Sequence, residues 1–184
     1  MRHNFIATRE KSLLLIIDLQ TVMLKAIAGW EQSIKCTGQL VQAARVLDVP
    51  VLLTEQYKKG LGGTHPEILD DIDDPRIVAK EHFSACLEPE FLSTLHSLNR
   101  QKIVVAGTET HVCVLQTCLD LLQEGYQVHL AADAVGSRRV ENRDMAISQL
   151  RQAGAVISSA EIVIFEWTRR ANTEEFRRIL PIVK

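Results

Sequence analysis

The sequence lacks the long apolar run that a membrane span requires. No stretch of its 184 residues approaches the ~18 consecutive apolar residues of a transmembrane helix. Residues 1–11 carry several charged side chains and contain no apolar segment of the kind found in secretory signals. We therefore expect no membrane partner and a cytoplasmic location.

Charge of one sign is also scarce. The net charge is −2, and no block of like charge stands out. Nucleic-acid binding usually leaves a basic patch or stripe, whereas here only three Arg-Arg pairs occur, at 138–139, 169–170 and 177–178. The last two pairs fall in a helical tail, where a solvated face explains them. We therefore expect no nucleic-acid partner.

Cysteine is sparse and follows no ligand pattern. The four cysteines, at positions 36, 86, 113 and 118, match neither a zinc ribbon nor a CxxC redox pair. Without a secretory signal, reduced thiols in a cytosol-like compartment are expected. Cys36, Cys86 and Cys118 are interpreted as small buried hydrophobes, which leaves Cys113 to be explained.

The remaining composition is that of an ordinary globular protein. Hydrophobic residues make up 46% of the chain and charged residues 24%. A chain of this length can bury one sizeable core, and no internal repeat or low-complexity segment interrupts it. We expect a single domain over residues 1–184.

Apolar runs that end at polar residues predict fully buried parallel strands. The expected strands cover residues 12–17, 49–54, 77–79, 102–106, 127–132 and 155–157. Helical patterns alternate with them, at residues 32–47, 90–99, 111–124, 142–152 and 176–179. Strands that alternate with helices form βαβ units around a parallel sheet. The sequence therefore predicts the α/β class, with a mainly parallel sheet of about six strands.

Two segments leave the pattern open. The β-branched residues of 162–165 favour a strand, but residues 158–161 before them resemble the start of a helix. Residues 56–75 form one long loop with glycines at positions 60, 62 and 63. Such a loop is either a lid over a binding site or a plain connector.

Three chemically active side chains follow predicted strands. Asp18 comes directly after the first strand, Lys80 after the third, and the turn that follows the fourth strand leads to Cys113. In open parallel sheets, ligands bind outside the carboxyl ends of the strands. An acid, a base and a thiol are therefore expected at the same end of one sheet.

Cys113 is the candidate nucleophile because of its position. Thr110 is a plausible N-cap, which would place Cys113 in the first turn of a helix. Free N–H groups and the helix dipole there favour a thiolate and a developing oxyanion, and a nearby Lys80 would lower the thiol pKa further. Asp18 would take the thiol proton and later deliver it to the leaving group.

Structural alternatives exist for each of these residues. Asp18 would otherwise only cap a strand, Lys80 would lie on the surface, and Cys113 would fill a core. His111 precedes Cys113 by two residues, a spacing at which it points away, so it is not expected to be the base. Two other functions remain open: a catalytically idle binding or scaffold protein, and a redox-sensing thiol, for which Cys118 is a poor resolving partner.

Five segments carry a resemblance that runs through nearly the whole chain. They are LLLIIDLQ at 13–20, LLTEQYKKGLGGTHPEI at 52–68, AKEHFSAC at 79–86, VVAGTETHVCVLQTCLDLLQEGYQVHLAADAVGSR at 104–138 and RQAGAVISSAE at 151–161. In this order they resemble the isochorismatase-like cysteine hydrolases, the superfamily that also holds nicotinamidases and N-carbamoylsarcosine amidases. The subgroup with a TEQYxKGLG loop consists of short isochorismatase-domain hydrolases of unassigned substrate.

The resemblance implies a Rossmann-like three-layer α/β/α sandwich with an Asp-Lys-Cys triad at Asp18, Lys80 and Cys113. It also implies a cis peptide bond between Thr108 and Glu109. That bond would turn the Glu109 N–H toward the N–H of Cys113 and complete an oxyanion hole. The implied activity is cysteine-dependent hydrolysis of a small molecule, at an amide or related C–N bond, through a thioester.

The chain departs from parts of this superfamily. Nicotinamidases place a metal site after the second strand with an Asp and histidines, whereas this chain has Glu55, Gln56 and Tyr57 there. We therefore expect no metal and no other cofactor. The isochorismatases of siderophore pathways do not use the cysteine, so their activity is not transferred. Residues 162–165 are helical in the superfamily, which favours a helix here.

Pocket residues are inferred from their places beyond the strand ends. Gln20, Tyr57 and Phe83 are expected to line the substrate pocket, and Gln56 and Leu61 lie in the candidate lid. The expected partners are a small-molecule substrate and further copies of the chain, because members of the superfamily are commonly dimeric or larger.

Overall fold

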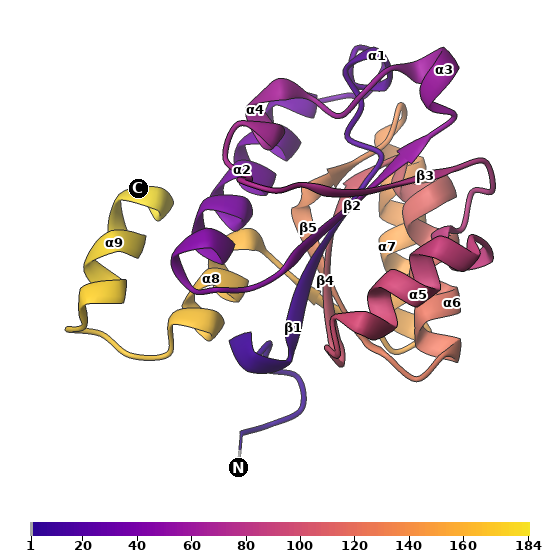
Figure 1. The fold of residues 1–184 in the computed structure, drawn as a ribbon. Coiled ribbons are helices and arrows are strands. Elements are labelled where there is room, and N and C mark those ends of the chain that lie inside the picture. The colour runs from indigo at the N-terminus through magenta and orange to yellow at the C-terminus, as the bar shows by residue number, and fades with distance from the viewer. Residues whose placement is uncertain (1) are drawn as a thin grey trace.

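The computed structural model describes residues 2–184 and contains one six-stranded sheet in which every pairing is parallel (Figure 1). The strand order is β3-β2-β1-β4-β5-β6. The strands are β1 (Ser12–Ile17), β2 (Val51–Gln56), β3 (Arg76–Lys80), β4 (Lys102–Thr108), β5 (Gln127–Gly136) and β6 (Val156–Ser158). This sheet confirms the predicted α/β class.

Helices cover both faces of the sheet and complete the three-layer sandwich (Figure 1). One face carries α2 (Trp30–Val46), α8 (Ala160–Thr168) and α9 (Glu174–Val183). The other face carries α5 (Pro89–Ser97), α6 (Leu115–Gln123) and α7 (Val140–Gln152). Single helical turns connect these elements: α1 (Thr21–Leu24), α3 (Lys58–Leu61), α4 (Pro66–Leu69), η1 (Arg9–Lys11), η2 (Ala85–Leu87) and the π-helical η3 (Thr110–Val114).

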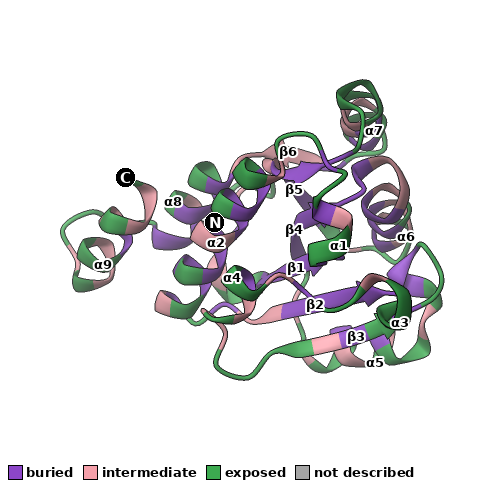
Figure 2. Ribbon diagram, turned by 90° about the horizontal axis from the view of Figure 1, so that it is seen from above, coloured by how far each residue is buried: buried purple, intermediate pink, exposed green. Residues whose placement is uncertain are grey.

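The central strands consist of uninterrupted runs of apolar residues because both of their faces are buried (Figure 2). All six residues of β1 are buried. Leu14 and Ile16 pack with the core on the α2 side, while Leu13, Leu15 and Ile17 pack with the core on the α6 side. The predicted strand 12–17 is therefore confirmed, with the alternation of faces that a strand requires.

The structure also assigns the two segments that the sequence pattern left undecided. Residues 162–165 lie within α8, whose first turn is capped by the Ser159 hydroxyl accepting from the Ile162 N–H at 3.3 Å. The helix assignment is confirmed, because a serine cap satisfies a free N–H at the helix start whatever the β-branched residues prefer. The long loop 56–75 contains the short helices α3 and α4, which the sequence pattern did not predict. No helix within residues 2–184 is long and apolar enough to cross a membrane.

The order of the strands determines where a site can form. The chain runs from β1 outward to β2 and β3, then returns to place β4 on the other side of β1. Strand order thus reverses between β1 and β4, the position where open α/β sheets bind ligands. A Cβ at Gly107 would lie 2.2 Å from the Ile17 carbonyl oxygen, so only glycine lets β4 pass this close to the end of β1.

His129 is a buried histidine in the middle of this sheet. It lies on β5, its side chain is fully buried, and neither ring nitrogen has a hydrogen-bond partner. Burial, aided by the charge of Lys102, lowers the pKa of His129 to about 4. Its ring is therefore neutral at physiological pH, and protonation has to occur against the apolar surroundings.

We predict that His129 makes the fold acid-sensitive. Because its pKa rises from about 4 to about 6.5 on unfolding, the unfolded chain binds the extra proton between these values. The contribution of neutral His129 to the free energy of unfolding should be fully present above pH 6.5. The free energy of unfolding should then fall by on the order of 3 kcal/mol by pH 4. Urea unfolding at pH 7, 5.5 and 4.5 measures this. A His129→Leu variant should lose stability less steeply, and parallel slopes for the two proteins would contradict the prediction.

Candidate active site

The carboxyl ends of β1, β3 and β4 bring together the predicted acid, base and thiol. Asp18 follows β1, Lys80 ends β3, and Cys113 lies in η3, which directly follows β4. All three side chains are buried, with residue exposures of 0%, 2% and 3% respectively. The structure therefore places Asp18, Lys80 and Cys113 together, although they are far apart in the sequence.

Asp18 is held by the neighbouring strand ends. Its backbone has a φ of 52°, which turns the chain out of β1. One carboxylate oxygen accepts from the Thr54 hydroxyl at 2.7 Å, and the other lies 2.8 Å from the Lys80 ammonium. The Asp18 carbonyl accepts from the Thr108 hydroxyl at 2.6 Å. Residues of β2, β3 and β4 thus determine where this carboxylate lies.

Lys80 is a buried cation surrounded by acceptors. Besides the Asp18 carboxylate, its Nζ donates to Gln56 Oε1 at 2.5 Å, to the Phe83 carbonyl at 3.1 Å and to the His82 carbonyl at 3.3 Å. A buried ammonium is costly unless it is paired and hydrogen-bonded. These contacts meet that requirement without help from solvent.

The helix start at Cys113 differs from the prediction. Thr110 is not an N-cap: it is the first residue of η3, and its buried hydroxyl has no hydrogen-bond partner. Glu109 occupies the cap position instead, and its carbonyl accepts from the N–H groups of Val112 and Val114. The turn is π-helical. This form is rare in proteins overall but occurs frequently at functional sites. Cys113 still lies in the first turn after β4.

The expected cis peptide bond between Thr108 and Glu109 is not present. No peptide bond among residues 2–184 is cis. The chain turns instead through Gly107, with a φ of 143°, and through Glu109, with φ near 0° and ψ near 93°. A trans bond at this non-proline position avoids a cost of ~3–4 kcal/mol.

The pKa of the Cys113 thiol also differs from the expected direction. Burial and the Asp18 carboxylate raise it to about 12, and the Lys80 ammonium lowers it only in part. The expectation of a low thiol pKa was based on the helix start and on Lys80, and it left out the loss of hydration. In this resting site the sulfur is therefore a protonated thiol.

A cavity of about 400 Å³ opens onto the Cys113 thiol. This volume is in the range of small-molecule sites, ~300–1,000 Å³. Its walls are mainly apolar, with few polar groups at the sulfur and the rim. The lining residues are Met23, Ala26, Gln56, Leu61, Phe83, Glu109, Val112, Cys113 and Arg138.

The structure brings one of the three predicted pocket residues to this cavity. Phe83 lines it, as do Gln56 and Leu61 of the candidate lid. Tyr57 does not, since its side chain is 54% exposed and borders a separate cavity beside Lys58. Gln20 is fully buried and binds backbone groups of the loop instead.

Sequence reasoning missed the rim residues Met23, Ala26, Val112 and Arg138. Arg138 donates to the buried Glu109 carboxylate at 2.8 Å, and His111 Nδ1 lies 3.1 Å from the same carboxylate. His111 also lies 3.0 Å from the Ser137 hydroxyl. The His111 ring therefore contacts Glu109 and Ser137, in keeping with the expectation that it points away from the thiol.

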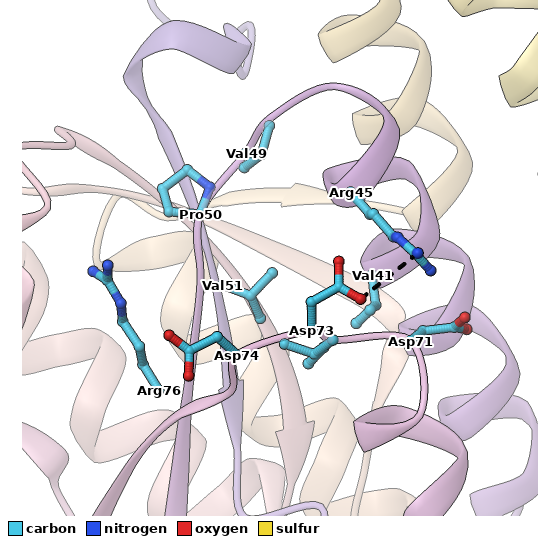
Figure 3. Close-up of a pocket in the computed structure, with 10 residues that line it drawn as sticks. Val41, Arg45, Val49, Pro50, Val51, Asp71, Asp73, Asp74 and Arg76 are labelled. Atoms are coloured by element: carbon cyan, nitrogen blue, oxygen red, sulfur yellow. Dashed lines mark ion pairs between the residues drawn. The ribbon is translucent and has the colours of Figure 1, made fainter.

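Two other features of the structure lack this chemistry. The cavity in Figure 3, about 260 Å³, lies at the start of β2, where Arg45 pairs with Asp73 at 3.6 Å and no cysteine, serine or threonine is among the lining residues. Within residues 2–184, no group of three or more His, Cys, Asp or Glu side chains is arranged to hold a metal ion.

Glu55, next to Gln56 on β2, holds the loop that carries Leu61. Its buried carboxylate accepts from the Thr64 N–H and hydroxyl at 2.8 and 2.9 Å and pairs with Lys58 at 2.9 Å. Burial acts to raise its pKa, but these contacts outweigh burial and lower it. Glu55 therefore anchors both ends of the segment that carries Leu61.

Comparison with known proteins agrees with this fold. The family model described as "Isochorismatase domain" matches residues 12–162. A secreted isochorismatase effector of Phytophthora sojae is 41% identical over 179 residues, covering 95% of this chain and 85% of the relative. Isochorismatase domain-containing protein 2A of mouse is 38% identical, with coverage of 95% and 84%.

A solved structure, titled as MAR1 ribonuclease from Caenorhabditis elegans, superposes with a TM-score of 0.91 at 35% identity. The superposition covers 96% of this chain and 91% of that one. The family match extends over most of the chain, and the relatives share its whole architecture. The chain therefore belongs to the isochorismatase family.

Proposed function

We propose that the chain is a cysteine-dependent hydrolase of a small molecule, acting at an amide or related C–N bond through a thioester. The observation that supports this most directly is the meeting of Asp18, Lys80 and Cys113, of which Cys113 lines the cavity. A nucleophile, a base and a group that orients the base are the parts of a catalytic triad. The family's hydrolase fold supplies the setting.

The raised thiol pKa defines the first chemical step. Since the resting sulfur is protonated, Asp18 takes the proton as the sulfur attacks the substrate carbonyl carbon. The Lys80 ammonium keeps the carboxylate oriented and balances its charge before the transfer. The carbonyl oxygen becomes an oxyanion, held by the backbone N–H of Cys113 in the first turn after β4. Without the cis bond, the Glu109 N–H is not assigned to this oxyanion hole.

The later steps reuse the same proton. The C–N bond breaks, Asp18 gives its proton to the leaving nitrogen, and an amine or ammonia departs from a thioester on Cys113. Water then attacks the thioester with Asp18 as base, which releases the acid and restores the thiol. Phe83 and Leu61 supply apolar contacts for the rest of the substrate.

The apolar cavity favours a small molecule over a polynucleotide. Its one cationic lining residue, Arg138, is paired with Glu109, and phosphate-rich ligands are bound by unpaired cations. We therefore do not extend ribonuclease activity, which the name of the nematode protein states, to this chain. A cytoplasmic location and assembly into a homo-oligomer complete the proposal.

A catalytically idle binding protein is the competing function, and the protonated thiol is the observation that favours it. The hydrolase and the binding protein differ in whether a covalent intermediate forms on Cys113. A hydrolase acquires the mass of the substrate's acyl group on Cys113 during turnover, whereas a binding protein acquires none. Mass spectrometry of the quenched protein distinguishes them.

We predict that Cys113→Ala lowers turnover by at least about a thousandfold, because the attacking atom is lost. The measurement is a screen of small amides, ureas and carbamoyl compounds, followed by kinetics on any substrate found. Cys36→Ala is the matched control, since Cys36 lies on α2 against the opposite face of the sheet. Undiminished activity of Cys113→Ala would refute the mechanism.

We also predict that the two charged partners shift the reactivity of Cys113 in opposite directions. Asp18 raises the thiol pKa and Lys80 lowers it. At pH 8, iodoacetamide should therefore modify Cys113 faster in Asp18→Asn and more slowly in Lys80→Met than in the wild type, although both variants lose turnover. Peptide mass spectrometry follows residue 113 specifically.

Near-ultraviolet circular dichroism is the control that tests whether both variants are folded. Equal alkylation rates in the three folded proteins would show that Cys113 does not interact with the Asp18–Lys80 pair.

A further inference from the structure

Gln56 makes an unusual set of contacts for a residue outside the triad. It ends β2, opposite Lys80 in the register of β3, and it lines the cavity. Its Oε1 accepts from the Lys80 ammonium at 2.5 Å and lies 3.9 Å from the Cys113 sulfur, which donates to it. One neutral oxygen therefore contacts both the cation and the nucleophile of the site.

The Gln56 carboxamide is held from both ends. Its Nε2 donates to the Glu81 carbonyl at 2.8 Å, which fixes which end of the amide faces Lys80. Its backbone N–H donates to Gln20 Oε1 at 2.8 Å, and its carbonyl accepts from Gln20 Nε2 at 3.0 Å. Gln20 also donates to the Gly62 carbonyl at 2.7 Å. The orientation of Oε1 is thus determined by groups around it and not by the substrate.

An oxygen in this place affects the two charge states of the sulfur differently. A protonated thiol can donate to a carbonyl oxygen, whereas a thiolate is an acceptor and gains nothing from a second acceptor. The same oxygen occupies one of the three N–H donors of Lys80, and Asp18 and the Phe83 carbonyl lie close to the others. These acceptors therefore compete with a resting thiolate for the donors of Lys80.

We propose that Gln56 is a positioning residue of this site, whose side-chain oxygen holds the Lys80 ammonium toward Asp18 and keeps Cys113 a protonated thiol until substrate binds. This inference rests on the proposed hydrolase function for its catalytic meaning. Its physical content, control of the thiol by Gln56, does not depend on knowing a substrate. The nucleophile is thereby protected from adventitious electrophiles and oxidants while the site is empty.

Two substitutions at position 56 should act in opposite directions. In Gln56→Leu the oxygen is lost and a Lys80 donor is freed to turn toward the sulfur, so iodoacetamide should modify Cys113 at least tenfold faster at pH 8. In Gln56→Glu a negative charge replaces the neutral oxygen, so modification should be at least tenfold slower. Gln152→Leu, an exposed site at the end of α7, is the matched control and should react like the wild type.

The remaining cysteines report whether the variants are folded. Cys36, Cys86 and Cys118 are buried and, unlike Cys113, do not line the cavity, so they should stay unmodified in any folded variant. If the three cysteines become reactive in Gln56→Leu, that variant is misfolded. The near-isosteric Gln56→Glu then tests the proposal by itself. Rates within twofold of wild type in folded Gln56 variants would overturn the proposal, even where Cys113→Ala abolishes turnover.

Kinetics separate positioning from substrate binding once a substrate is found. A positioning role predicts that Gln56→Leu lowers kcat about ten- to a hundredfold with a smaller change in KM. A change in KM alone would assign Gln56 to substrate binding and overturn the positioning role. A family of variants in which alkylation shifts but no substrate is turned over would leave control of the thiol standing and refute the hydrolase function.

Discussion

The ion pair between Asp18 and Lys80, buried at 2.8 Å, is the interaction on which the site depends. Removing two charges from water costs several kcal/mol per ion, so such a pair persists only with accurate geometry and additional hydrogen bonds. Thr54 of β2 supplies one of these bonds to Asp18, and Gln56 at the end of the same strand supplies one to Lys80. The carboxyl ends of β1, β2 and β3 are therefore aligned by the requirements of two charges.

Burial is the main reason why Cys113 is a thiol at rest, and the ion pair adds to it. The paired charges largely cancel at a distance, but Cys113 lies close to both, and the Asp18 carboxylate raises the thiol pKa further. The helix start, worth up to about 2 kcal/mol to a charge in a partly buried site, does not offset the burial of the sulfur. In the proposed mechanism, activation comes from proton transfer to Asp18 during attack, which limits reactivity to molecules that fit the cavity.

The sequence predicted the elements whose signals are local. Residues 12–17 form a strand with the predicted bounds because all six are apolar or small and are buried on both faces. Asp18, Lys80 and Cys113 could be placed together because parallel strands end at one edge of the sheet. The turn after β4 was not predictable in detail, since its π-helical form and trans bond depend on how Glu109 and Gly107 fit against β1. Thiol pKa likewise depends on burial, which appears only once the chain is folded.

The roles of Gln20 and Tyr57 show how far position alone can be trusted. Both residues follow strand ends, yet the left-handed backbone of Tyr57, with φ at 39°, turns its side chain outward, and Gln20 is used to bind the loop. Through Gln20, the lid carbonyl of Gly62 and the backbone of Gln56 are attached to one side chain. Glu55, next to Gln56, anchors the other contacts of the lid. The end of β2 is therefore bonded both to the loop that carries Leu61 and to Lys80, so the wall of the cavity and the charge pair are held by the same strand end.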